Sequence, residues 1–132
     1  MGAVRLLIVI DFNSEIPIYI QLNDQIIMGI AGNALLPGEA LPSVRRMAAD
    51  IGVNVNTVNK AYNILKDAGY IAIDRRSGCY VSTAIPPPDD KLSAELGERL
   101  KPIAAAAACR HMGSEAFLSL CKVIYDELGV RT

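Results

Sequence analysis

The chain has 132 residues, of which 52% are hydrophobic, and its 13 lysines and arginines against 14 aspartates and glutamates give a net charge of −1. This hydrophobic content predicts a buried core and excludes an intrinsically disordered chain, while the near-neutral charge points to no particular partner. The three cysteines have no paired spacing, which argues against a disulfide framework and favours free thiols in a reducing cytoplasm.

The first apolar run is Leu6–Ile10. It is too short for the apolar region of a signal peptide or for a membrane span, so we interpret it as part of a strand over about Arg5–Asp11. No later stretch approaches ~18 uninterrupted apolar residues. The sequence therefore predicts a soluble cytoplasmic protein.

The next element is a helix that begins near Pro17 and ends at about Gly32. Proline is tolerated in the first turn of a helix, and Ser14 or Asn13 could cap it. Apolar residues then recur at helical spacing: Ile18, Leu22, Ile26 with Ile27, and Ile30.

Two more helices follow, separated by a tight turn. Ser43 is a good N-cap for a short helix over 44–50 that ends near Gly52. Asn54 caps the following helix, and Gly69 supplies the position just after its end. Strands over 70–73 and 79–82 flank a basic turn at 74–78.

This order of elements is typical of a helix-turn-helix followed by a wing. We therefore expect an α+β fold, mostly α: a winged helix-turn-helix with a short C-terminal tail of two helices for dimerisation.

The helix over 54–68 predicts the function most directly. On a helical wheel, the apolar side chains fall on one arc: Val55, Val58, Ala61, Tyr62 and Leu65. Polar side chains fall on the opposite arc: Asn56, Asn59, Lys60 and Asn63. A carboxamide offers one acceptor and two donors, which match the edge of adenine in the major groove.

Basic residues surround this amide face. Residues 43–85 contain six lysines and arginines against three aspartates, a local balance of +3. Thr57 could contact a thymine methyl or a phosphate, and Arg45 and Arg46 could reach phosphates or a guanine edge. Arg75 and Arg76 on the wing could enter a minor groove or clamp the DNA backbone. We interpret the three elements together as a surface for double-stranded DNA.

Several motifs resemble the GntR family of bacterial transcription regulators over about residues 10–83. They are PIYIQL at 17–22, LPGEALPSVRRMAADIGVNVNTVNKAY at 36–62, GYI at 69–71 and GCYV at 78–81. The short tail is similar to that of the YtrA subgroup. The resemblance implies a homodimer that represses transcription, often at the promoter of its own operon, which commonly includes transporter genes.

The resemblance also implies the DNA contacts. The matching positions are Ser43, Arg45, Asn54, Asn56, Thr57, Asn59, Lys60 and the wing from Arg75 through Arg76 to Gly78, with Arg46 added from its charge. Many family members carry arginine where this chain has Val55 and Asn59. Adenine reading is therefore favoured here over guanine reading.

The proline run Pro86–Pro88 marks the clearest boundary. We expect a DNA-binding domain over 1–85, a linker over 86–90 and a helical dimerisation tail over 91–132. The tail predicts a helix over 90–111, kinked or split by Pro102 near Leu100, and a helix capped by Ser114 that ends near Leu128. Its apolar residues exceed what two helices can bury between them, which favours an isologous dimer and an inverted-repeat operator. They are Leu96, Leu100, Ile103, Phe117, Leu118, Cys121, Ile124 and Tyr125.

Two alternatives stay open at this point. The chain could be a thiol- or metal-responsive regulator that uses Cys109, His111 and Cys121, or a winged helix that binds a protein. The sequence assigns no sensing role to these residues or to Cys79. An enzyme is disfavoured because there is one histidine and no catalytic spacing, so no cofactor or metal is expected.

Overall fold

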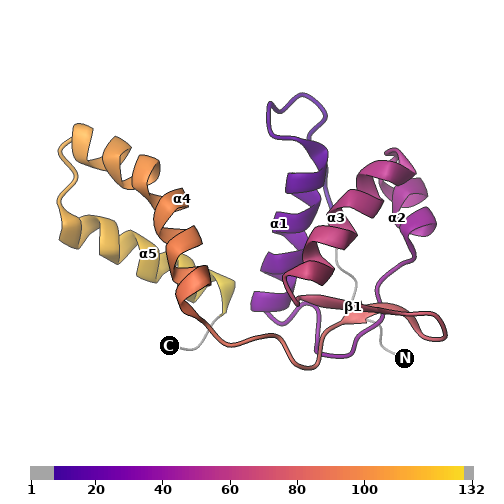
Figure 1. The fold of residues 1–132 in the computed structure, drawn as a ribbon. Coiled ribbons are helices and arrows are strands. Elements are labelled where there is room, and N and C mark those ends of the chain that lie inside the picture. Colours follow the sequence, from indigo (N-terminus) through magenta and orange to yellow (C-terminus); the bar gives the residue numbers. More distant parts are fainter. Residues whose placement is uncertain (1–7, 130–132) are drawn as a thin grey trace. The chain divides into compact units, whose positions relative to one another are not determined.

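The computed structural model describes residues 8–129. They divide into two compact units, and the boundary along the chain falls between Ile85 and Pro86. None of the described helices is both long enough and apolar enough to span a bilayer. The elements, shown in Figure 1, are α1 (Ile18–Ala31), α2 (Val44–Ile51), α3 (Val55–Asp67), β1 (Ile71–Asp74), β2 (Gly78–Val81), α4 (Asp90–Cys109) and α5 (Ser114–Leu128). The expected α+β, mostly helical fold is confirmed.

The predicted N-terminal strand is wrong in its described part, 8–11, and residues 5–7 lie outside the described residues. The Gln25 side chain accepts a hydrogen bond from the N–H of Val9 at 2.9 Å and donates one to the Val9 carbonyl at 2.6 Å. Gln21 bonds Asp11 in the same way, at 2.9 and 3.1 Å. Two side-chain amides on α1 therefore satisfy the backbone groups that a neighbouring strand would otherwise pair.

The beginning of α1 also differs from the prediction. Pro17 is the N-cap residue, and no side chain caps the helix. The Ser14 hydroxyl accepts instead from the N–H of Ile16 at 3.0 Å, and the N–H of Asn13 donates to Asp11 at 2.9 Å. Both predicted caps thus belong to the turn before the helix.

The predicted caps of α2 and α3 are confirmed. The Ser43 hydroxyl accepts from the N–H of Arg46 at 3.1 Å, and the Asn54 carboxamide oxygen accepts from the N–H of Asn56 at 2.7 Å. Gly52 ends α2 at φ 71°, and nothing lies within 4 Å of where its Cβ would stand. Left-handed backbone, and not lack of space, therefore requires glycine in the turn between the two helices.

The core of the first unit lies where α3 packs against α1 and α2 (Figure 1). Four of the five predicted α3 core residues, Val58, Ala61, Tyr62 and Leu65, are buried. The prediction for Val55 is wrong, because 45% of this residue is exposed. Val55 and Tyr62 lie at nearly the same angle on the helix, but Val55 is about 10 Å nearer the N-terminus, where the core no longer covers it.

The wing is an antiparallel hairpin in which Ile71 pairs with Val81 and Asp74 with Gly78. Each strand differs by one residue from its predicted bounds. The outer edge of β2 is also paired: the N–H of Leu41 donates to the Cys79 carbonyl, and the N–H of Val81 to the Glu39 carbonyl, both at 2.8 Å. The chain that enters α2 is thereby tied to the wing.

The second unit is a pair of helices. The Asp89 carboxylate caps α4 by accepting from the N–H of Leu92 at 2.8 Å. The predicted split at Pro102 is wrong, since α4 continues through this residue. Proline removes one N–H donor, and water can satisfy the orphaned carbonyl of an exposed helix. Ser114 is also not a cap: it is the first residue of α5, after Gly113.

Candidate nucleic-acid interface

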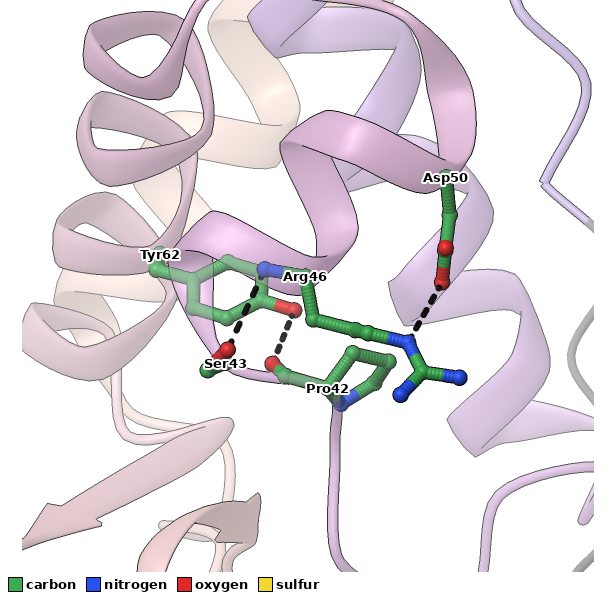
Figure 2. A network of polar contacts seen from close by, with 5 residues as sticks. All are labelled: Pro42, Ser43, Arg46, Asp50 and Tyr62. Carbon is green, nitrogen blue, oxygen red and sulfur yellow. Dashed lines mark hydrogen bonds and ion pairs between the residues drawn. The ribbon is translucent and has the colours of Figure 1, made fainter.

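A buried tyrosine fixes the beginning of α2 relative to α3. Tyr62 is 0% exposed, and its hydroxyl donates a hydrogen bond to the Pro42 carbonyl at 2.9 Å, as Figure 2 shows. Burial raises the pKa of Tyr62 above its ordinary value, so the hydroxyl keeps its proton. Because Pro42 precedes the N-cap Ser43, the exposed first turn of α2 is held against α3.

The two arginines of that turn are in different environments. Arg45 is exposed and forms no ion pair within the described residues. The guanidinium of Arg46 lies 3.4 Å from the Asp50 carboxylate, one helical turn along α2 (Figure 2). A surface pair of this kind contributes about 1 kcal/mol or less. Arg46 could exchange Asp50 for a phosphate at little cost.

The amide face of α3 is exposed at Asn56 and Asn59, and Thr57 on the same turn is half-buried. The carboxamide oxygen of Asn54 is already used as a cap, so this side chain has its N–H donors left for a ligand. The amide face itself, which does not include Asn54, keeps its exposed carboxamides at Asn56 and Asn59.

A contact that sequence reasoning missed involves Tyr19 on α1. The Lys60 ammonium lies 4.0 Å from the centroid of the Tyr19 ring, a cation–π contact. It directs the Lys60 charge to the side of α3 that faces α1. Lys60 is therefore better placed for a phosphate at the edge of a groove than for a base at its centre.

The tip of the wing is ordered by Asp74. Its carboxylate accepts from the N–H of Arg76 at 3.0 Å and from the Ser77 hydroxyl at 2.9 Å. The hydrogen bond from the Arg76 backbone, and to a smaller extent that from the Ser77 hydroxyl, hold the pKa of Asp74 below its usual value. Gly78 follows at φ 79°, a left-handed backbone conformation. The turn is thus closed without either arginine side chain, and Arg75 and Arg76 are both exposed.

We expect Arg75→Ala and Arg76→Ala each to weaken binding to every duplex. Each should lower the slope of log Kd against log salt concentration by about one per protomer, because one phosphate contact is lost. Binding titrations at several salt concentrations measure this slope. Arg99→Ala is the control, since it removes the same charge from exposed residues of α4. A wing variant with the same slope as Arg99→Ala would remove the wing from the interface.

The structure places every candidate DNA contact on the first unit and brings them onto three elements. Ser43, Arg45 and Arg46 begin α2, and Arg75, Arg76 and Gly78 form the wing. The remaining candidates lie at the start or in the first half of α3: Asn54, Asn56, Thr57, Asn59 and Lys60. Thr57 is half-buried, and all the other candidates are exposed.

The thiols do not form a site. Among the described residues, no group of three or more histidine, cysteine, aspartate or glutamate side chains could hold a metal ion. Cys79 is buried in β2, whereas Cys109 is exposed and Cys121 half-buried. No geometry in this part of the chain favours the metal-responsive alternative.

Burial raises the pKa of Cys79 to about 11. At pH 8 about one Cys79 thiol in a thousand is ionised, and the thiolate is the reactive form. We expect a thiol reagent at pH 8 to modify Cys109 first and Cys79 after denaturation, as read by mass spectrometry of peptides. Because ionisation is disfavoured in the fold, raising the pH towards 11 should destabilise it. Equal labelling of both thiols in the folded protein would contradict this burial.

Comparison with known proteins agrees with the geometry. The family described as bacterial regulatory proteins, gntR family, matches residues 18–81. The HTH-type transcriptional regulator YhcF of Bacillus subtilis is 38% identical over 66% of this chain and 74% of its own length. The HTH-type transcriptional repressor YtrA of the same organism is 42% identical over 58% of each chain.

A solved structure extends the likeness to the tail. A transcriptional antiterminator from Listeria monocytogenes EGD-e superimposes with a TM-score of 0.82 at 27% sequence identity, over 92% of each chain. The relatives and this neighbour are named as regulators of transcription, and none of these three names describes an enzyme.

Proposed function

Because the chain belongs to the GntR family of bacterial transcription regulators and has YtrA-like relatives, we propose that it is a repressor that binds an inverted-repeat operator as a homodimer. A DNA-binding regulator, and not an enzyme, is what the family and the relatives establish. The repressor role, the operator symmetry and the dimer are the proposal. The name of the repressor YtrA supports the first of them, and control of the chain's own operon, with transporter genes, is part of the same proposal.

One observation carries the proposal: α3 bears exposed amides and packs against both α2 and β1, and exposed arginines lie in the first turn of α2 and in the turn after β1. Asn56 and Asn59 offer donors and acceptors, Arg45 belongs to the first turn of α2, and Arg75 and Arg76 to the ordered tip of the wing. Base edges in a major groove take the first kind of group, and phosphates take the second. A protein surface as the partner would not require this division between amides and guanidinium groups.

The tail supports the homodimer. Neither α4 nor α5 has a buried residue. Of the eight predicted dimerisation residues, Phe117 and Cys121 are half-buried within one chain, and the other six are 45 to 65% exposed: Leu96, Leu100, Ile103, Leu118, Ile124 and Tyr125. Apolar exposure on this scale in a two-helix unit favours an interface. A second copy supplies the same apolar set, and thus an isologous contact.

We therefore propose that residues 1–85 bind DNA and residues 91–132 hold two copies together. Two-fold symmetry then presents two α3 helices to one face of the duplex, about 34 Å or a multiple apart. The operator is accordingly an inverted repeat whose half-sites are separated by whole helical turns.

Asn59→Ala tests the reading helix. We expect it to cost about 1–3 kcal/mol on the operator and to relax the preference at one base pair of each half-site, because a bidentate amide–adenine contact is lost. Titrations of operator and random duplexes measure both effects. Asn63→Ala removes the same group one turn further from the N-terminus of α3, where base contacts are not expected. Equal losses on operator and random DNA would assign Asn59 to positioning alone.

Selection of bound sequences from random duplex DNA tests the proposal as a whole. We expect the recovered sequences to contain an inverted repeat with adenine and thymine at the central positions of each half-site. A recovered set with a single unrepeated motif would contradict the dimer, and a set with no motif would contradict sequence-specific binding. Salt dependence separates DNA binding from a protein-interaction role, since phosphate contacts release counterions.

A further inference from the structure

The first residue of α3 is an exposed apolar side chain on the DNA-facing end of the helix. Val55 is 45% exposed and belongs neither to the hydrophobic core nor to the partly buried residues packed against it. Valine is also a poorer helix former than alanine, leucine or lysine. Neither packing within this unit nor helix propensity therefore accounts for valine at this position.

The neighbours of Val55 are the amides proposed to read bases. Asn59 lies four residues further along α3, so its Cβ stands about 5–6 Å from that of Val55 on the same side of the helix. Asn54 precedes Val55 and has its carboxamide oxygen engaged by the N–H of Asn56 at 2.7 Å. The cap fixes the backbone around Val55, and its stiff, β-branched side chain is fixed with it.

The major groove offers one apolar group, the C5-methyl of thymine. We propose that Val55 is a specificity-determining residue that contacts a thymine methyl in each half-site, one or two base pairs from the adenine read by Asn59. The inference rests on the proposed function and extends it to the base that the helix selects. A cytosine at that position presents an N–H donor and no methyl, so the contact discriminates against it.

Replacing thymine with deoxyuridine tests the contact, because it removes the methyl group and keeps every hydrogen-bonding group. We expect the wild-type chain to bind about fourfold more weakly for each half-site in which one particular thymine is replaced, because the free energy of burying one methyl group corresponds to this factor. Val55→Ala should bind the thymine operator more weakly by a similar factor and should be insensitive to deoxyuridine at that position. Alanine favours helix, so the variant is expected to fold.

Ile64→Ala is the matched control. Ile64 is 43% exposed and lies about 180° around α3 from Val55 at 100° per residue, so its variant should keep the full deoxyuridine effect. Wild-type binding that is unchanged by deoxyuridine at every thymine, or an undiminished effect in Val55→Ala, would overturn the inference while operator binding stands. Failure to prefer any duplex would overturn the proposed function as well.

Discussion

Placing glutamates on the apolar face of the tail, with Leu100→Glu and Ile124→Glu together, is expected to give a folded monomer whose operator affinity is about 10² to 10⁴-fold lower. Both residues are 45% exposed, so neither substitution buries a charge within one chain. The affinity falls because the second half-site is no longer bound intramolecularly by a linked α3. Sedimentation gives the mass in solution, and titration of the operator gives the loss of affinity.

The control must carry the same added charge, because extra carboxylates also repel DNA. Ala105→Glu with Ser119→Glu serves, since both residues are exposed and lie on the opposite sides of α4 and α5 from the apolar set. This control is expected to stay dimeric and to bind with nearly unchanged affinity. If the Leu100 and Ile124 variant also stays dimeric and binds tightly, the contact between copies lies elsewhere.

Tyr62→Ala is expected to have the largest effect on stability. The residue is fully buried, and truncation of a buried aromatic side chain costs about 3–5 kcal/mol in free energy of unfolding. Small domains are stable by about 5–15 kcal/mol in all. A large fraction of the stability of the first unit should thus be lost, and denaturant titration of the full chain measures it.

Tyr62→Phe separates the hydroxyl from the ring. It leaves the Pro42 carbonyl without the donor that lies at 2.9 Å, and we expect a cost of about 1–2 kcal/mol. Tyr80→Phe is the matched control, since Tyr80 is half-buried and its hydroxyl donates no hydrogen bond within the described residues. Equal costs for the two phenylalanine variants would contradict a specific role for the Tyr62–Pro42 bond.

The elements that the sequence predicted correctly depend on local chemistry. Ser43 and Asn54 cap their helices because each side-chain oxygen reaches an N–H two or three residues away. Gly52 ends α2 through its own backbone preference. The prediction of an N-terminal strand was wrong for the opposite reason. Gln21 and Gln25 satisfy the backbone groups of this segment from α1, across a loop, and no local sequence pattern indicates such a partner.

The candidate site shows the same limit. The residue types on α3 could be predicted from helical periodicity, but a wheel ignores position along the axis and so placed Val55 in the core. The pairing of Arg46 with Asp50 follows a four-residue spacing that the sequence does contain. The contact of Lys60 with Tyr19 comes from the packing of α3 against α1, which no local spacing specifies.

We propose that the first unit reads duplex DNA through α3 when two copies present it together. The most direct test titrates the full chain with the selected inverted repeat, a scrambled duplex of equal composition and a single-stranded RNA, at rising salt. We expect the inverted repeat to bind at least about 10³-fold more tightly than the others at moderate salt, with log affinity falling linearly in log salt. Equal affinity for the three nucleic acids, or no fall of affinity with salt, would contradict sequence-specific binding of duplex DNA by α3.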